Sequence, residues 1–399
     1  MTARPRHILP VIAISQFAGV SLWFSSNAIL PDLQASWHLP PEALGDLTSA
    51  TQFGFIAGTL VFAFTALADR ISPRKIFLAC ALLGAVANGA AVLLDQALLA
   101  LLVLRFATGF FLAGIYPVGM KIAAGWFDRD LGRALGYLVG ALVGGTALPH
   151  LIRGLGESPP WQEVTLAVSV FAIAGGLLMF ATVPDGPFHR AGAVFNPKAL
   201  LVVFHNRDFR GSAFGYFGHM WELYAFWAFA PVVLAAYAAA RGLALDISLW
   251  TGAIIATSVA SCMVGGLLSP RLGSAPVAAV QLAISGLCCL VSPLLFFAPP
   301  WLFLPFLLVW GLAVAGDSPQ FSALNARFAP PELVGSALTI ANCIGFTISI
   351  VSIQLLNRTV DALGADWVLV LLVPGPVFGL WALRPLLRPA AVRATISAR

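Results

Sequence analysis

Charged residues are scarce in this sequence. Only 10% of the 399 residues are Asp, Glu, Lys or Arg, whereas 59% are hydrophobic. Soluble globular domains carry about a quarter charged residues, so this chain has too few to cover a water-facing surface of its size. The composition therefore argues against a soluble protein.

Cysteine pairs and enzyme motifs are also missing. The five cysteines all lie in apolar stretches and form no Cys-x-x-Cys: Cys80, Cys262, Cys288, Cys289 and Cys343. Their expected role is packing rather than a disulfide or metal site. His-Glu-x-x-His and Gly-x-Ser-x-Gly are absent, and no lysine follows a glycine as in phosphate-binding loops. We therefore expect no enzyme activity, no cofactor, no metal and no direct drive by ATP.

Apolar stretches of the length that a helix needs to cross a bilayer recur along the whole chain. The first begins at Ile8 after a basic N-terminus and continues to about Leu30, too long for a signal peptide, so we expect an uncleaved span. Twelve spans are predicted, at about residues 8–30, 44–68, 76–94, 98–123, 133–153, 163–183, 211–238, 248–269, 276–297, 301–325, 333–356 and 366–385.

Segments of the first half return after about 200 residues, as in duplicated chains. Three such pairs are Ala68–Ser72 with Ser269–Gly273, Ala113–Pro117 with Ala315–Pro319, and Leu22–Trp23 with Leu223–Tyr224. In a very apolar protein, a duplicated half is typical of secondary transporters, whose substrate site lies at the repeat interface. We expect an all-α integral membrane protein with twelve transmembrane helices in two pseudo-symmetric six-helix halves.

A polar linker separates the halves. The expected boundaries are 1–183 for the N-terminal bundle, 184–210 for a cytoplasmic linker, and 211–399 for the C-terminal bundle with its basic tail. With the N-terminus inside, the outer side holds only Arg153, Arg241 and Arg358, and every other Lys and Arg except Arg105 lies on the cytoplasmic side. This asymmetry predicts that both termini are cytoplasmic. It also accounts for the net charge of +5 without a nucleic-acid partner.

The segment Thr65–Lys75 resembles the signature loop between the second and third helices of the major facilitator superfamily, usually written Gly-x-x-x-Asp-Arg-x-Gly-x-Arg-Arg/Lys. Asp69, Arg70, Arg74 and Lys75 match, and two of the glycines are replaced. An acid on this turn can cap a helix N-terminus or pair with an arginine across the two halves. The resemblance implies that this contact holds the outward-open state and acts as a gate.

Two further segments carry the same resemblance. Gly266–Gly273 is a degenerate second copy of the loop, in which Arg271 is kept and Pro270 replaces the acid. Arg105–Gly109 in the fourth span, followed by Gly114, is similar to the family's arginine–glycine pattern in that helix. The resemblance covers essentially the whole chain, and it implies alternating access between the two halves.

The expected function is proton-linked secondary transport of a small organic solute. There are two alternatives among transporters: a drug or metabolite efflux antiporter, and an organic-anion uptake permease. An alternative that is not a transporter is a membrane receptor on the same fold. The expected partners are the solute, protons and the lipid bilayer. The expected location is the bacterial inner membrane, where the chain would act as a monomer.

Three charged residues lie deep in predicted spans: Arg105, Glu222 and Asp317. A charge at the centre of a membrane helix costs roughly 2.5–3.5 kcal/mol on insertion scales, so each is a functional candidate. They fall in spans four, seven and ten, which the resemblance, together with span one, assigns to the central cavity.

Glu222 lies near the middle of its span, and His219 is one turn earlier on the same face. Both side chains can exchange protons, so we expect Glu222 to be the proton carrier with His219 as its partner. The alternative is a structural acid neutralised by Arg105 or by a backbone group.

Alternatives stay open for the other candidates. Arg105 could hold an anionic substrate, or it could be a structural or proton-relay residue. Asp317 could serve the site and its gating, or only support a local helix break. Cavity-wall candidates are Trp23 and Tyr224, at equivalent repeat positions, with the polar residues Asn27, Gln16, Gln52, Gln320 and Asn342.

Overall fold

The computed structural model describes residues 5–127, 131–155, 159–188 and 195–388. Five residues used to predict the orientation lie outside this part of the chain: Arg4, Arg129, Arg190, Arg393 and Arg399. The described residues form helices and no strand. Twelve of these helices or helix pairs are long and apolar enough to cross a membrane, which confirms the predicted number of spans.

The first six spans are built from α1 (Ile8–Val20), α2 (Ser25–Trp37), α3 (Ala43–Thr65), α5 (Pro73–Gly89) with η1 (Ala90–Leu93), α6 (Leu98–Leu112), α7 (Tyr116–Trp126), α8 (Leu131–Gly154) and α9 (Trp161–Thr182). The predicted second span was too long at its end. Ala66 takes a left-handed conformation (φ 49°), which ends α3, and the short α4 (Leu67–Arg70) follows. The predicted first span was too short, because α2 continues past the apolar run through Asp32 and Gln34.

The last six spans are built from α11 (Arg207–Arg241), α12 (Ile247–Leu272), α13 (Ser274–Phe296), α14 (Pro300–Val314), α15 (Ser318–Phe328), η2 (Pro331–Leu333), α16 (Val334–Leu363), η3 (Val368–Leu372), α17 (Pro374–Leu383) and η4 (Arg384–Leu387). The short α10 (Ala199–Val203) lies in the linker. The Asn206 side chain caps α11 by accepting hydrogen bonds from the backbone N–H groups of Asp208 and Phe209.

The two halves repeat the same packing. Residues 113–115 interrupt the span of α6 and α7, and residues 315–317 interrupt the span of α14 and α15 at the equivalent place. A Cβ on Gly109 would lie 1.9 Å from the carbonyl oxygen of Thr51, and one on Gly311 would lie 2.2 Å from that of Ile254. Only glycine permits such a close approach of two helix backbones. The duplication seen in the sequence is therefore also present in three dimensions.

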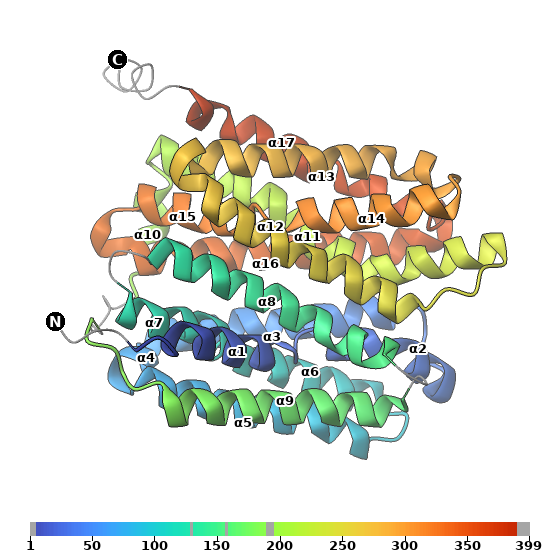
Figure 1. Cartoon of the computed structure of the whole chain (residues 1–399), viewed down its shortest axis with the longest axis horizontal. Coiled ribbons are helices and arrows are strands. Elements are labelled where there is room, and N and C mark those ends of the chain that lie inside the picture. The colour runs from blue at the N-terminus through green and yellow to red at the C-terminus, as the bar shows by residue number, and fades with distance from the viewer. Residues whose placement is uncertain (1–4, 128–130, 156–158, 189–194, 389–399) are drawn as a thin grey trace.

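Figure 1 shows the two halves side by side, with α1–α9 below and α11–α17 above. They meet along two seams, where α8 packs on α12 and α3 packs on α16. The linker with α10 lies at the end of the molecule where α1 begins, and α2 ends at the opposite end. We call these the linker end and the far end.

Candidate transport site

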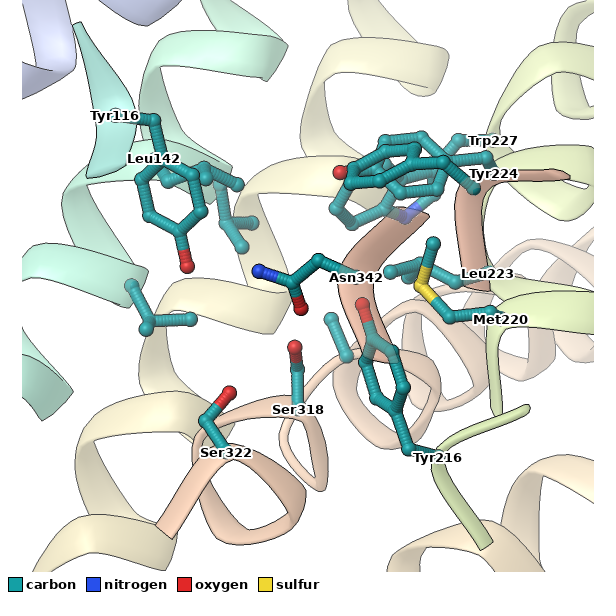
Figure 2. Close-up of a pocket in the computed structure, with 14 residues that line it drawn as sticks. Tyr116, Leu142, Tyr216, Met220, Leu223, Tyr224, Trp227, Ser318, Ser322 and Asn342 are labelled. Carbon is teal, nitrogen blue, oxygen red and sulfur yellow. The ribbon is translucent and has the colours of Figure 1, made fainter. Parts of the chain in front are cut away.

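A cavity lies between the two halves (Figure 2). About 480 Å³ of its space is not filled by atoms, and part of that space is open to solvent. Its wall consists of Tyr116, Val139, Leu142, Val143, Tyr216, Met220, Leu223, Tyr224, Trp227, Ala315, Ser318, Ser322, Asn342 and Phe346. None of these side chains is charged. The wall is therefore aromatic and polar but neutral, and both halves contribute to it.

Aromatic rings from both halves close the cavity toward the far end. Trp23 stacks on Tyr224 with ring centroids 5.6 Å apart, and it lies 5.4 Å from Phe346. Phe24 meets Trp227 edge to face at 6.2 Å. Trp23 and Phe24 belong to the N-terminal half, and their partners belong to the C-terminal half. We call Trp23, Phe24, Tyr224, Trp227 and Phe346 the aromatic cluster, which joins the two halves on the far-end side of the cavity.

Hydrogen bonds close the seam between α3 and α16 beyond the aromatic cluster. Gln52 Nε2 donates to Ser349 Oγ at 3.1 Å. Gln354 Nε2 donates to Asp46 Oδ1 and Ser49 Oγ, and Asn357 Nδ2 donates to the Glu42 carbonyl. We call these residues the far-end latch. Among the described residues, every hydrogen bond between the two six-span halves belongs to this seam.

The other seam loosens toward the linker end. At the far end, a Cβ on Gly154 of α8 would lie 2.6 Å from the Leu249 nitrogen of α12. At the linker end of α8, a Cβ on Gly136 would have no atom of another segment within 4 Å. The two halves are therefore packed most closely at the far end of this seam, and α8 and α12 stay in contact toward the linker end, where a Cβ on Gly266 would lie 4.0 Å from the Gly136 Cα.

Arg105 forms all of its hydrogen bonds with residues of the N-terminal half. Its guanidinium is 2% exposed and donates to the carbonyl oxygens of Leu22 and Trp23 at 2.9 and 3.0 Å. Further bonds go to Asn88 Oδ1 at 2.8 Å and Thr51 Oγ1 at 3.2 Å. The Leu22 and Trp23 carbonyls lie in the break between α1 and α2. The geometry favours the structural alternative for this arginine, because it satisfies the helix break and does not line the cavity.

His219 and Asp317 form a buried pair behind the cavity wall. His219 Nδ1 and Asp317 Oδ1 are 2.8 Å apart, and both side chains are almost completely buried. Asp317 lies in the break between α14 and α15, next to the lining residue Ser318. His219 precedes the lining residue Met220 on α11. The sequence suggested Glu222 as the partner of His219, whereas the structure pairs His219 with Asp317.

Glu222 points toward α13 rather than into the cavity. Ser285 Oγ donates to Glu222 Oε2 at 2.7 Å, and Cys289 Sγ lies 3.4 Å from the same oxygen. Trp310 Nε1 donates to Ser285 Oγ at 3.1 Å, which extends the network to α14. The other carboxyl oxygen, Oε1, is buried with no partner in the described part of the chain. No arginine contacts Glu222 in the described part of the chain. The alternative that Arg105 neutralises Glu222 is therefore wrong.

The predicted wall residues divide into two groups. Tyr224 lines the cavity and Trp23 stacks on it, whereas Asn27 lies behind the wall and donates to Thr48 Oγ1 at 2.9 Å. Gln320 is buried on α15 but is not a lining residue. The candidate list missed Tyr116 and Ser318. These two occupy equivalent repeat positions beside the two helix breaks, which is the signal that could have found them.

The predicted gate residues lie at the linker end. Asp69 pairs with Lys121 of α7, which belongs to the same half. Arg74 donates to the Phe180 carbonyl at 3.4 Å and lies over the Phe180 ring. Three further gate candidates are exposed: Arg70, Lys75 and Arg271. Asp69 thus has a lysine of its own half as an ion-pair partner.

Comparison with known proteins agrees with this architecture. The model of the Major Facilitator Superfamily matches residues 12–353, which is most of the chain. The chain belongs to the Major Facilitator Superfamily. Similar solved structures of this superfamily include a bacterial homologue of the human lysosomal transporter Spinster, in an inward-facing conformation, with a TM-score of 0.74 and 13% identity over 96% of this chain and 98% of that one.

Two further proteins with which this chain shares similarity are named as transporters. The proton:xylose symporter XylE aligns with a TM-score of 0.72 and 14% identity over 96% of both chains. A Bacillus subtilis (strain 168) protein, NiaP, which is named as a putative niacin/nicotinamide transporter, is 29% identical over 169 residues. That match spans 40% of this chain and 39% of NiaP. Family and fold together make this superfamily member a secondary transporter of small solutes, built as a multi-pass membrane protein.

Proposed function

We propose that this superfamily member couples the transport of a small organic solute to protons. The observation that carries the proposal is the set of buried titratable groups in the C-terminal half: His219, Glu222 and Asp317, each 0% exposed. A charged side chain in a membrane helix costs roughly 2.5–3.5 kcal/mol, so such groups are rare unless they serve a function. Among the described residues, neither acid contacts a Lys or Arg.

The positions of these groups suit proton exchange with the cavity. The His219–Asp317 pair is flanked by lining residues on both of its helices, so a shift of α15 against α11 would expose it to solvent. Glu222, the sequence-based candidate for the coupling group, lies one turn further along α11, where it contacts Ser285 of α13. We propose Asp317 with His219 as the proton site next to the solute, and Glu222 as a second proton site.

Alternating access would proceed by rocking of the two halves about the cavity. The far-end latch and the aromatic cluster would open to admit or release the solute at the far end. The organic-anion alternative has little support, because the cavity wall offers no cation and Arg105 is saturated by its own half. One chain contains the whole cavity, so we propose that the monomer is sufficient for transport.

We also propose that the linker end is cytoplasmic, which would place the chain in the bacterial inner membrane with both termini inside. The asymmetry of Lys and Arg supports this orientation. Reporter fusions after residue 399 and within residues 184–210 should both report the cytoplasm. A C-terminal reporter on the outside would refute the orientation.

The test of coupling is solute-driven proton movement. Purified protein is reconstituted into liposomes that contain a pH-sensitive dye, and candidate solutes are added outside without an imposed gradient. Nicotinamide and nicotinate are suitable first solutes, given the name of NiaP. A coupled transporter changes the internal pH when its solute moves, and a proton-selective ionophore abolishes that change. Solute uptake with no dye response would contradict proton coupling.

A further inference from the structure

The cavity wall presents five neutral polar groups that have no hydrogen-bond partner in the described part of the chain: the side chains of Tyr116, Tyr216, Ser318, Ser322 and Asn342. Figure 2 shows the hydroxyl groups of Tyr116, Ser318 and Ser322 around one open space, with the Asn342 amide between them. Both halves supply them, since Tyr116 belongs to α7. These groups have no partner within the protein, so they are available to form hydrogen bonds with a bound molecule.

We propose that this cavity binds an uncharged aromatic solute that carries amide or hydroxyl groups, such as a pyridine carboxamide. The inference rests on the proposed role of the cavity as the transport site. It narrows the solute from any small organic molecule to one chemical class, and it assigns the five polar groups as its hydrogen-bonding partners.

The absence of charge in the wall argues for a neutral solute. A carboxylate or phosphate would have to leave water without a cation to meet it, because no described lining residue is Lys, Arg or His. A cationic solute would find no acid in the wall, since Asp317 is held by His219 behind it.

Three aromatic side chains in the cavity wall favour a flat solute. Tyr224, Trp227 and Phe346 all line the cavity, and Tyr224 lies edge to face with Trp227 at 5.6 Å. Rings of this kind bind another ring by offset stacking or edge contacts, at distances of about 4.5–7 Å. The lining rings therefore favour a solute with a flat aromatic ring of its own.

The test uses three probes with one ring and different charges. Nicotinamide is neutral, nicotinate is an anion and 1-methylnicotinamide is a cation at neutral pH. Binding is measured by calorimetry on the full chain in detergent, with thermal shift as a second readout. No proton gradient is present, so a failure of proton coupling would leave this result unaffected. Benzamide is a neutral aromatic amide without the ring nitrogen, so it tests whether that nitrogen is needed. Glucose is a neutral solute without an aromatic ring.

Two variants link binding to the cavity. Tyr216→Phe removes one hydroxyl and keeps the ring, and Asn342→Leu removes the amide at similar volume. Tyr237→Phe is the matched control, because Tyr237 lies on the same helix but donates to the Ala298 carbonyl at 2.8 Å, away from the cavity. A lost hydrogen bond of about 1 kcal/mol corresponds to roughly a fivefold loss of affinity.

The expected result is that nicotinamide and benzamide bind at least about tenfold more tightly than nicotinate and 1-methylnicotinamide. Tyr216→Phe and Asn342→Leu should each weaken that binding severalfold, and Tyr237→Phe should not. Tighter binding of the anion or the cation would overturn the proposal. So would binding of glucose alone, or no binding of either neutral ring below about 10 mM.

Discussion

The two halves of this transporter share a scaffold but place their buried charges differently. In the N-terminal half, the first span is broken at residues 21–24, and Arg105 donates to two carbonyls of that break. In the C-terminal half, α11 runs unbroken through the equivalent region, and Leu307 stands at the repeat position of Arg105. The helix break and the arginine therefore occur together in one half and are absent together from the other.

The difference indicates a division of roles. The N-terminal half uses its buried charge to stabilise a helix break that carries Trp23 and Phe24 into the aromatic cluster. The C-terminal half keeps its buried titratable groups out of contact with any described Lys or Arg. Under the proposed function, one half provides a fixed structural platform and the other provides proton exchange.

The largest effect should come from removing Arg105. Arg105→Ala leaves the two break carbonyls and the Asn88 amide without their donor inside the membrane, where each hydrogen bond to a charged group is worth about 1.5–3 kcal/mol. We expect the melting temperature of the purified protein to fall by about 5–10 °C, or the protein not to accumulate. Arg105→Lys should recover part of the loss.

Leu307→Ala is the matched control for that change. It creates a cavity at the equivalent repeat position but leaves no polar group unsatisfied, so a typical core loss of about 2–5 kcal/mol is expected without effect on the first span. If Arg105→Ala melts like the wild type, the structural role of the arginine is wrong.

A cross-link between the halves should abolish transport while leaving the fold intact. Hydrogen bonds join the halves at the α3–α16 seam, whereas the α8–α12 seam is packed around glycines, so the cross-link is placed at the α3–α16 seam. Gly45→Cys with Asn357→Cys places two thiols across the far-end latch within reach of a disulfide, because a Cβ on Gly45 would lie 2.9 Å from the Asn357 Cβ. Solute uptake should be lost on oxidation and return on reduction. Full uptake by the oxidised protein would show that the far end need not open.

The equivalent glycines of the two helix breaks should differ in tolerance. A Cβ on Gly114 would lie 2.2 Å from Cys80 Sγ and 2.9 Å from a Phe62 ring carbon. A Cβ on Gly316 would meet the terminal amide of Gln281, which can rotate away. Gly114→Ala should therefore lower the melting temperature more than Gly316→Ala, and Cys80→Ala should partly rescue it. Equal losses at both positions would contradict this reading of the packing.

The fold was predictable from the sequence because hydropathy and repetition extend over many residues. The twelve spans and the similarity of the two halves follow from such patterns, whereas the helix breaks at residues 21–24 and 113–115 were not predicted. The pairing within the site was not predictable in the same way. His219 and Glu222 share a helix and a spacing of three, yet one faces Asp317 on the α14–α15 break and the other faces Ser285 on α13. Contacts between helices decide those pairs, and no pattern along one helix contains them.

The smallest effect should come from the gate loop, which only the N-terminal half keeps intact. Asp69→Asn weakens the ion pair with Lys121. If the loop has the expected gate role, it biases the conformational equilibrium, and this change should slow transport severalfold with solute affinity largely unchanged. Lys121→Met should have a similar effect. Parental transport rates in a normally folded Asp69→Asn protein would remove the gate role.

The most direct test of proton coupling through the C-terminal half compares two transport modes in the same proteoliposomes. Wild type, Asp317→Asn and Glu222→Gln are assayed for accumulation driven by an imposed pH gradient and for exchange of labelled against unlabelled solute. Both variants mimic the protonated acid, so we expect loss of gradient-driven accumulation with exchange retained, most completely for Asp317→Asn. Gradient-driven accumulation at the wild-type level in both variants would contradict the assignment of proton coupling to these buried acids.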